Sequence, residues 1–457
     1  MHLRSVQLDD PSVETYCIPG ARVYERFFQV PLDYKNDQDD RTIQVFARHL
    51  TPLDKRVDLD KLPFLLYLQG GPGFEVALPS SASSGWIKVA LSRGYQVLLL
   101  DQRGTGLSTP ISAKSLAKLE TDDAKFEYLT HFRADNIVHD CELIRQELTV
   151  TAEDPKFSLI GQSFGGFCIT TYLSLYPESI REAFITGGVP PLVNSPDPVY
   201  RALYPRVLKR NKIYYEKYPR DVARVRKIHE YLSKNTVTLP NGGTLSPRRF
   251  LQLGIAFGQS GGYDQVHEFV LYAAQDLERD GELSYKSLNK LDQLQDWDTN
   301  VIYAILHEAI YCQDGQASNW SAERLRSEMP EFEWRLEHLK DDQPVYFTGE
   351  MIYPFMLDDY AELRPLKNVA ERLATYEGWG KLYDEDVLKG NEVPVAGVSY
   401  FDDMYVDLDL SQRTASKIKG FQAWVTNEYA HNGVRKDGER VFTYLIKLLA
   451  GDESYDR

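Results

Sequence analysis

The sequence predicts an α/β fold, a mostly parallel central sheet with a large helical cap inserted before the last strands. Short apolar runs closed by glycine alternate with helical patterns up to about residue 194, and the alternation resumes at about residue 391. Such alternation is typical of parallel strands that helices cover on both faces. At 457 residues, the chain suits one large domain with an insertion, or two domains. We therefore expect a core of residues 1–194 and 391–457 and a helical cap of residues 195–390.

Each strand is expected at a short apolar run. Residues 24–50 predict two strands, because apolar residues recur on either side of a polar, turn-like stretch at residues 33–41. The central strands are expected where the runs are continuously apolar and end at glycine or a turn. They comprise residues 64–68, 95–100, 157–160 and 183–186 before the insertion, and residues 393–400 and 421–426 after it.

Helices are expected where apolar residues recur every three to four positions. In residues 136–148 this pattern follows Asp135, which we predict to be the N-cap. A second helix is expected at residues 167–175. The other expected helices comprise residues 206–233 and 263–277 in the insertion and residues 411–419 and 439–449 near the end of the chain.

The composition disfavours several classes of function. The formal net charge of −15 argues against nucleic-acid binding, which needs a basic face. The sequence has no apolar run of about 18 residues and no apolar segment of a secretory signal at its start, so we expect no membrane span and a cytoplasmic location. The four cysteines are widely spaced and form no C-x-x-C pair, so neither a zinc site nor a dithiol redox site is expected.

Residues 161–165, with the sequence GQSFG, match the G-x-S-x-G nucleophile elbow of the α/β-hydrolase fold. This elbow holds a serine at a sharp turn between a strand and a helix, where its hydroxyl is exposed. Backbone N–H groups at the start of the helix face the negative charge that develops during acyl transfer. Ser163 follows the strand expected at residues 157–160 and precedes a helical pattern, so we predict that it is the nucleophile.

The pattern occurs a second time, at residues 258–262, with the sequence GQSGG. This match lies within the helical insertion instead of after a strand. We therefore interpret Ser260 as a loop residue, and we expect the two glycines that follow it to close a helix.

A glycine-rich loop, GGPG at residues 70–73, follows the strand expected at residues 64–68. In this fold, a loop in that position supplies one N–H group of the oxyanion hole, and the residue after the nucleophile supplies the other. Gly71 and Phe164 are therefore the candidate donors. The alternative interpretation of the loop is a tight turn without a catalytic part.

The acid and the base should follow the nucleophile in the order acid, then histidine. Of the nine histidines, only His431 lies beyond the strand expected at residues 393–400, and it occupies a polar loop that ends in glycine. We predict that His431 is the general base. The acid should end that strand, where Asp402 and Asp403 are adjacent. We favour Asp403, which leaves Asp402 as a turn or capping residue.

Together, these motifs resemble the proline iminopeptidases, serine peptidases of the α/β-hydrolase fold. The resemblance extends over nearly the whole chain, and DQRG within residues 101–108 is its most specific element. It is also strong at residues 69–73, 135–145 and 161–166. The family's usual forms are HGGPG and GGSWGG, so Gln69, Gln162 and Phe164 depart from them, which bears on substrate preference. The length is similar to that of the larger subgroup with an extended cap.

The resemblance implies an aminopeptidase that releases N-terminal proline through an acyl-enzyme on Ser163, without a metal or cofactor. Its substrates would be peptides with a free N-terminus. The family's cap supplies glutamates that pair with the α-ammonium group of the substrate, and Glu350 and Glu308 lie in segments that resemble those cap motifs. A buried carboxylate rejects a substrate that leaves it unpaired. The alternative for either glutamate is a surface residue or a helix-pair partner.

Two other functions stay open at this stage. One is an esterase or amidase on a small metabolite, with the cap adapted to an apolar acyl group. The other is a non-catalytic binding protein on the same fold, against which the intact serine, aspartate and histidine argue. Proline or alanine preference depends on the volume of the pocket, and the aromatic residues of the cap are compatible with a homo-oligomer.

Overall fold

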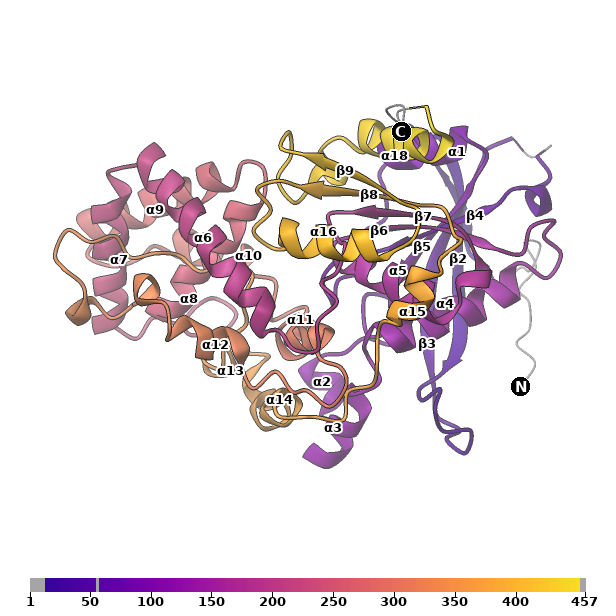
Figure 1. The fold of residues 1–457 in the computed structure, drawn as a ribbon. Coiled ribbons are helices and arrows are strands. Elements are labelled where there is room, and N and C mark those ends of the chain that lie inside the picture. Colours follow the sequence, from indigo (N-terminus) through magenta and orange to yellow (C-terminus); the bar gives the residue numbers. More distant parts are fainter. Residues whose placement is uncertain (1–12, 55–56, 453–457) are drawn as a thin grey trace.

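The computed structural model describes residues 13–54 and 57–452, and a nine-stranded sheet forms its centre (Figure 1). The strands follow the order β1-β2-β3-β5-β4-β6-β7-β8-β9. The first three pairings are antiparallel, and every pairing from β5 to β9 is parallel, so the prediction of a mostly parallel sheet is confirmed. The strands are β1 Thr15–Ile18, β2 Ala21–Pro31, β3 Thr42–Thr51, β4 Phe64–Leu68, β5 Gln96–Asp101, β6 Phe157–Gln162, β7 Ile180–Thr186, β8 Val395–Tyr400 and β9 Phe421–Thr426.

Helices cover both faces of this sheet, as its continuously apolar strands require. Alternate residues of β4 enter two separate hydrophobic clusters, with Leu66 and Leu68 in one and Leu65 and Tyr67 in the other. Helices α4 and α5 contribute to the first cluster, and α1 and α18 to the second. The helices of the core are α1 Gly85–Ser92, α2 Ala113–Leu116, α3 Asp122–Leu129, α4 Ala134–Leu148, α5 Phe164–Leu175, α16 Leu408–Lys417, α17 Gly433–Lys436 and α18 Gly438–Ala450.

One capping prediction is wrong. Asp135 lies inside the first turn of α4, and the N-cap position belongs to Arg133, whose side chain makes no capping hydrogen bond. A carboxylate in the first turn still faces the positive end of the helix, so the sequence signal was electrostatic and not a cap.

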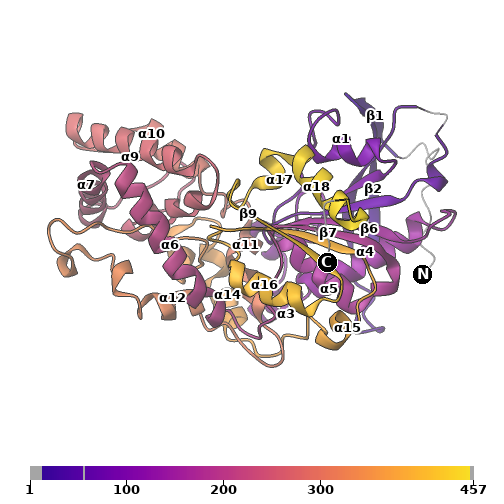
Figure 2. The same cartoon turned by 45° about the horizontal axis from the view of Figure 1, so that its top comes forward.

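The segment between β7 and β8 forms helices and loops and adds no strand to the sheet. Figure 2 shows α6, α7, α9 and α10 together on one side of the molecule, beyond the end of the sheet. The helices of this insertion are α6 Asp197–Lys217, α7 Asp221–Lys234, α8 Pro247–Leu251, α9 Gly262–Arg279, α10 Tyr285–Gln293, α11 Val301–Leu306, α12 Ser321–Arg326, α13 Met356–Asp359, α14 Lys367–Ala374 and α15 Glu385–Lys389.

The long helix expected at residues 206–233 is two helices. Helix α6 ends at Lys217 and α7 begins at Asp221, with Pro219 between them. The residue before a proline is driven out of the helical region, and Tyr218 has φ −127° and ψ 68°. The periodic apolar pattern continues across this break, because both helices bury one face against the same core.

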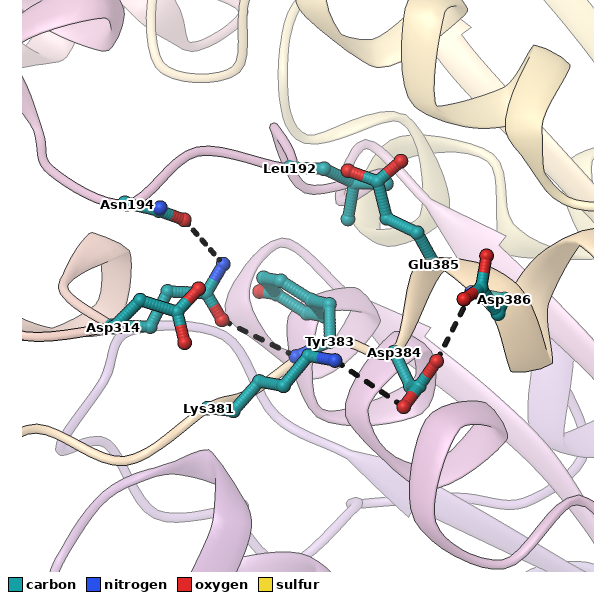
Figure 3. Close-up of a pocket in the computed structure, with 9 residues that line it drawn as sticks. Leu192, Asn194, Asp314, Lys381, Tyr383, Asp384, Glu385 and Asp386 are labelled. Carbon is teal, nitrogen blue, oxygen red and sulfur yellow. Dashed lines mark hydrogen bonds and ion pairs between the residues drawn. The ribbon is translucent and has the colours of Figure 1, made fainter.

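The two connections between the insertion and the core are joined by one buried side chain. Gln313 donates to the side chain of Asn194 at 3.1 Å, and its amide oxygen accepts from the backbone N–H of Leu382 at 2.9 Å. Gln313 and Asn194 line a small cavity of about 250 Å³, in which Lys381 pairs with Asp384 at 3.3 Å (Figure 3). The chain therefore leaves the core and returns to it at neighbouring points.

Within the described residues, no helix has the length and apolar character that a bilayer crossing needs.

Candidate active site

Ser163 lies directly after β6 and immediately before the first residue of α5. Its backbone has φ 55° and ψ −124°, which is a strained conformation for a residue with a side chain. The turn is also tightly packed, because a Cβ atom at Gly165 would lie 2.0 Å from the carbonyl oxygen of Leu68. Strand, strained serine and helix therefore form the local structure that a nucleophile elbow requires.

The glycine-rich loop after β4 lies against this serine. A Cβ atom at Gly70 would lie 3.0 Å from the Cβ of Ser163, so the loop packs directly against the serine side chain. The N–H of Gly70 is taken by the side-chain oxygen of Gln69 at 3.0 Å. Phe164 is the first residue of α5, where an N–H group has no acceptor within its own helix. Gly71 and Ser163 line the same cavity, and Phe164 follows the serine directly.

His431 and Asp403 form a buried pair at the carboxyl ends of β9 and β8. The Nδ1 atom of His431 lies 2.7 Å from Oδ2 of Asp403, and these residues are 6% and 2% exposed. The other oxygen of Asp403 accepts from the backbone N–H groups of Tyr405 and Val406. Asp402 points elsewhere and pairs with Lys209 at 2.7 Å. The structure thus brings Asp403, and not its neighbour, to the histidine.

The surroundings of His431 decide its protonation. Burial lowers the pKa of His431, but the charge of Asp403 and its hydrogen bond outweigh burial, so the pKa is raised above its ordinary value. Because Asp403 accepts at Nδ1, the neutral ring keeps its proton there and leaves Nε2 as the acceptor. That tautomer is the one a general base needs.

A cavity of about 500 Å³ joins residues of the core to residues of the insertion. From the core it is lined by Ser163, His431 and Gly71, and from the insertion by Tyr303 and Glu350. Tyr303 donates a hydrogen bond to Glu350 at 2.8 Å. Burial raises the pKa of Glu350 to about 7, although its hydrogen bond and the nearby His431 act in the opposite direction. A carboxyl group with this pKa is stabilised as an anion when a cation enters the cavity.

Glu308 does not have the surroundings that we expected. It is buried, and its two carboxylate oxygens accept from the backbone N–H groups of Ser321 and Ala322 at 3.1 and 2.9 Å, at the start of α12. It is not among the residues that line the cavity of Ser163. Burial raises the pKa of Glu308 to about 7, as for Glu350. In this structure Glu308 fixes the start of a helix, and of these two glutamates only Glu350 lines the cavity of Ser163.

Comparison with known proteins places these residues in a family. The model of the alpha/beta hydrolase fold family matches residues 63–380. The crystal structure of a Mycobacterium smegmatis proline iminopeptidase is similar over 94% of this chain and 100% of its own, at 14% identity and a TM-score of 0.39. A proline iminopeptidase of Aeromonas sobria is 46% identical over 95% of this chain and 98% of its own length. One from Aspergillus aculeatus is 42% identical over 94% of each. The chain belongs to the proline iminopeptidase family.

Two of the positions that depart from the usual proline iminopeptidase motifs share a partner. The guanidinium of Arg435 lies 3.2 Å from the side-chain oxygen of Gln69 and 3.4 Å from that of Gln162. Gln69 also accepts from the hydroxyl of Tyr67 at 2.9 Å. A hydrogen-bonded bridge therefore joins the glycine-rich loop after β4, the end of β6 and α17.

Sequence reasoning missed the residues that hold the histidine loop. The ring of Tyr405 packs edge-on against His431, with 4.7 Å between the ring centres. The N–H of His431 donates to the carbonyl of Gly258 at 3.1 Å, and the hydroxyl of Ser260 donates to the side chain of Asn432 at 3.1 Å. Tyr405 lies two residues after Asp403, which was its one local signal. The contacts from the insertion have no signal in the sequence, because they join residues far apart in the chain.

Proposed function

We propose that this chain is a serine aminopeptidase that releases N-terminal proline from peptides with a free N-terminus. One observation carries the proposal. A half-buried carboxyl group, Glu350, lines the same cavity as Ser163 and His431. A hydrolase for uncharged esters gains nothing from such a group, whereas a peptidase that reads an α-ammonium group needs it.

Recognition of the amine begins with Glu350. Its carboxylate pairs with the ammonium group of the first residue, which places the first peptide carbonyl next to Ser163. Burial raises the pKa of the Glu350 carboxyl group to about 7, so its anion lacks a charged partner until an ammonium group binds, and a blocked N-terminus does not supply one. Tyr303 donates to the same carboxylate and fixes its orientation. We assign this role to Glu350 alone, because the oxygens of Glu308 already accept from the backbone.

The chemical steps follow from the arrangement of the three side chains. His431 takes the proton of the Ser163 hydroxyl, and the serine oxygen bonds to the carbonyl carbon, while Asp403 stabilises the imidazolium. The N–H groups of Gly71 and Phe164 hold the resulting oxyanion. The C–N bond then breaks, and the leaving amine takes the proton from His431. Water, activated by the same histidine, hydrolyses the acyl-enzyme and releases the amino acid. The steps require no metal or cofactor.

The helical insertion acts in this proposal as a cap. With residues 1–194 and 391–457 as the core and residues 195–390 as the cap, the nucleophile, base and acid come from the core and the amine anchor from the cap. The cap closes the cavity on the side of the first substrate residue, so the enzyme removes one residue at a time.

The test is hydrolysis of chromogenic amides of proline, N-blocked proline, alanine and leucine, and of a simple ester, with Ser163→Ala as the control. We expect the free prolyl amide to be cleaved best, the blocked one to be inert and the variant to be inactive. Preferential cleavage of the alanine amide would move the specificity to small residues. Turnover of the ester alone, or of blocked and free proline equally, would replace the proposal with an esterase or amidase.

A further inference from the structure

Arg435 places a positive charge on the wall of the catalytic cavity. It belongs to α17, two residues after the start of that short helix, and its side chain is exposed. Its hydrogen-bond partners are the neutral side-chain oxygens of Gln69 and Gln162, at 3.2 and 3.4 Å. In the described part of the chain, no carboxylate lies within ion-pair distance of this guanidinium.

The position of this cation relative to the nucleophile is defined by the same two glutamines. Gln69 precedes the oxyanion loop, and its side-chain oxygen also accepts from the N–H of Gly70, which contacts Ser163. Gln162 directly precedes Ser163. The guanidinium is therefore one hydrogen bond away from each of the two segments that meet at the scissile carbonyl.

The cavity wall thus includes the half-buried carboxyl group of Glu350, next to Ser163 and His431, and the guanidinium of Arg435, which has no ion-pair partner among the described residues. A short peptide carries the complementary charges, an ammonium group at one end and a carboxylate at the other. Consecutive Cα atoms are about 3.8 Å apart, so in a dipeptide the carboxylate lies one residue beyond the bond that is cleaved. A cavity of about 500 Å³ has room for a substrate of this size.

We propose that Arg435 binds the C-terminal carboxylate of the leaving group, so that the preferred substrates are proline-headed dipeptides with a free carboxyl end. This inference rests on the proposed aminopeptidase activity. A guanidinium binds a carboxylate through two parallel hydrogen bonds, which are shorter and stronger than its present contacts to amide oxygens. In longer peptides the amide carbonyl at this position is neutral, and that charge-assisted contact is lost.

Two further side chains confine the carboxylate to Arg435. Glu75 and Asp296 line the same cavity, and neither pairs with the arginine. Their negative charges repel a carboxylate anywhere else along the wall. A substrate with a neutral end avoids this repulsion but gains no contact with Arg435. Attraction to Arg435 and repulsion by Glu75 and Asp296 therefore favour the same position for the carboxylate.

The experiment compares Pro-Ala, Pro-Ala amide and prolyl p-nitroanilide as substrates of the wild type, Arg435→Gln and Arg435→Lys. For Arg435→Gln we expect kcat/KM on Pro-Ala to fall by about 10- to 100-fold, mainly through KM, because a hydrogen bond to a charged group is lost. The amide and the anilide should change by less than about twofold, and Arg435→Lys should retain part of the preference. Lys436→Gln is the matched control, since it removes the same charge from the next exposed residue, which does not line the cavity.

Each other result overturns the inference. An equal loss on all three substrates would mean that Arg435 acts on the nucleophile through Gln69 and Gln162, and no loss on any of them would leave it without a part in recognition. A melting curve like that of the wild type establishes that each variant is folded. If the wild type cleaves neither the anilide nor the dipeptides, the aminopeptidase proposal itself fails, which is a different outcome from a carboxylate preference that is absent in an active enzyme.

Discussion

The chain contains the letters GQS twice, at residues 161–163 and at residues 258–260, and each time the motif ends in the glycine that a nucleophile elbow requires. The first follows a buried strand, and its serine has φ 55° at the start of α5. The second begins at the last residue of a 3₁₀ helix, Gln252–Gly258, and Ser260 is exposed. The strand before the motif decides whether its serine can act as a nucleophile, because only a strand brings the serine to the edge of the sheet where the proposed base lies.

The second motif nevertheless contacts the active site. The carbonyl of Gly258 accepts from the N–H of His431, and Ser260 donates to Asn432. The glycines after Ser260 do not close a helix as expected, because Gly261 has φ 84° and precedes the start of α9 at Gly262. In the proposed mechanism, the first copy supplies the nucleophile, and the second contacts the loop that carries the proposed base.

The largest contrast between the two copies is that between their serines. We expect Ser163→Ala to lower kcat by roughly 10⁶-fold, because the nucleophile and its base act as a unit. Ser260→Ala removes one exposed hydrogen bond and should lower kcat by less than about threefold. Steady-state kinetics on prolyl p-nitroanilide measures both. A large loss in the second variant with activity retained in the first would reverse the assignment of the nucleophile.

The adjacent aspartates provide the next contrast. Asp403→Asn places an amide against Nδ1 of His431 and favours the wrong tautomer, so we expect kcat to fall by roughly 10⁴-fold. Asp402→Asn weakens an exposed pair with Lys209 and should leave kcat nearly unchanged. The same kinetic assay decides, with thermal melting as a check on folding. Similar losses in both variants would contradict the geometry.

The two glutamates of the insertion differ in the same way. Glu350→Gln should lower kcat/KM for free prolyl amides by roughly 10²- to 10³-fold, because the substrate's ammonium group is buried without its partner. Glu308→Gln should instead lower the melting temperature, since one backbone N–H at the start of α12 loses its acceptor. Loss of activity in Glu308→Gln at unchanged stability would restore it as an amine anchor.

The pH profile of the wild type separates these groups further. Burial raises the pKa of Glu350 to about 7, Asp403 raises the pKa of His431 above its usual value, and the proposed mechanism needs both groups deprotonated. Activity should therefore fall as the pH drops through about 7. In Glu350→Gln, the fall of activity at low pH should depend on the protonation of His431 alone, and this acidic limb of the pH profile should be less steep. An identical pH dependence in both enzymes would mean that Glu350 takes no part in the reaction.

Prediction from the sequence succeeded where the relevant signal is local. The parallel strands are continuous apolar runs, and the elbow and DQRG motif are contiguous. Strand β1 was missed because it has only four residues, Thr15–Ile18, which are exposed or partly exposed at the edge of the sheet. Glu308 and Glu350 could not be separated, because both lie among apolar residues. They differ because backbone N–H groups at the start of α12 donate to Glu308. Helix α12 begins 13 residues after Glu308, so no local sequence pattern indicates this contact.

The smallest contrast tests whether the second motif positions the base. A Cβ atom at Gly258 would lie 2.3 Å from the ring of Tyr405, which packs against His431 and whose hydroxyl donates to Ile255. Gly258→Ala must therefore displace that ring, and overpacking of this kind costs about 1–3 kcal/mol. We expect kcat to fall by about tenfold with little change in KM, and the apparent pKa of the acidic limb to shift, because the histidine loop moves while Glu350 does not. Ser260→Ala serves as the control, since it alters the same segment without touching Tyr405. A Gly258→Ala enzyme that melts earlier but retains kcat and the wild-type pH profile would mean that the contact supports the fold and not the base.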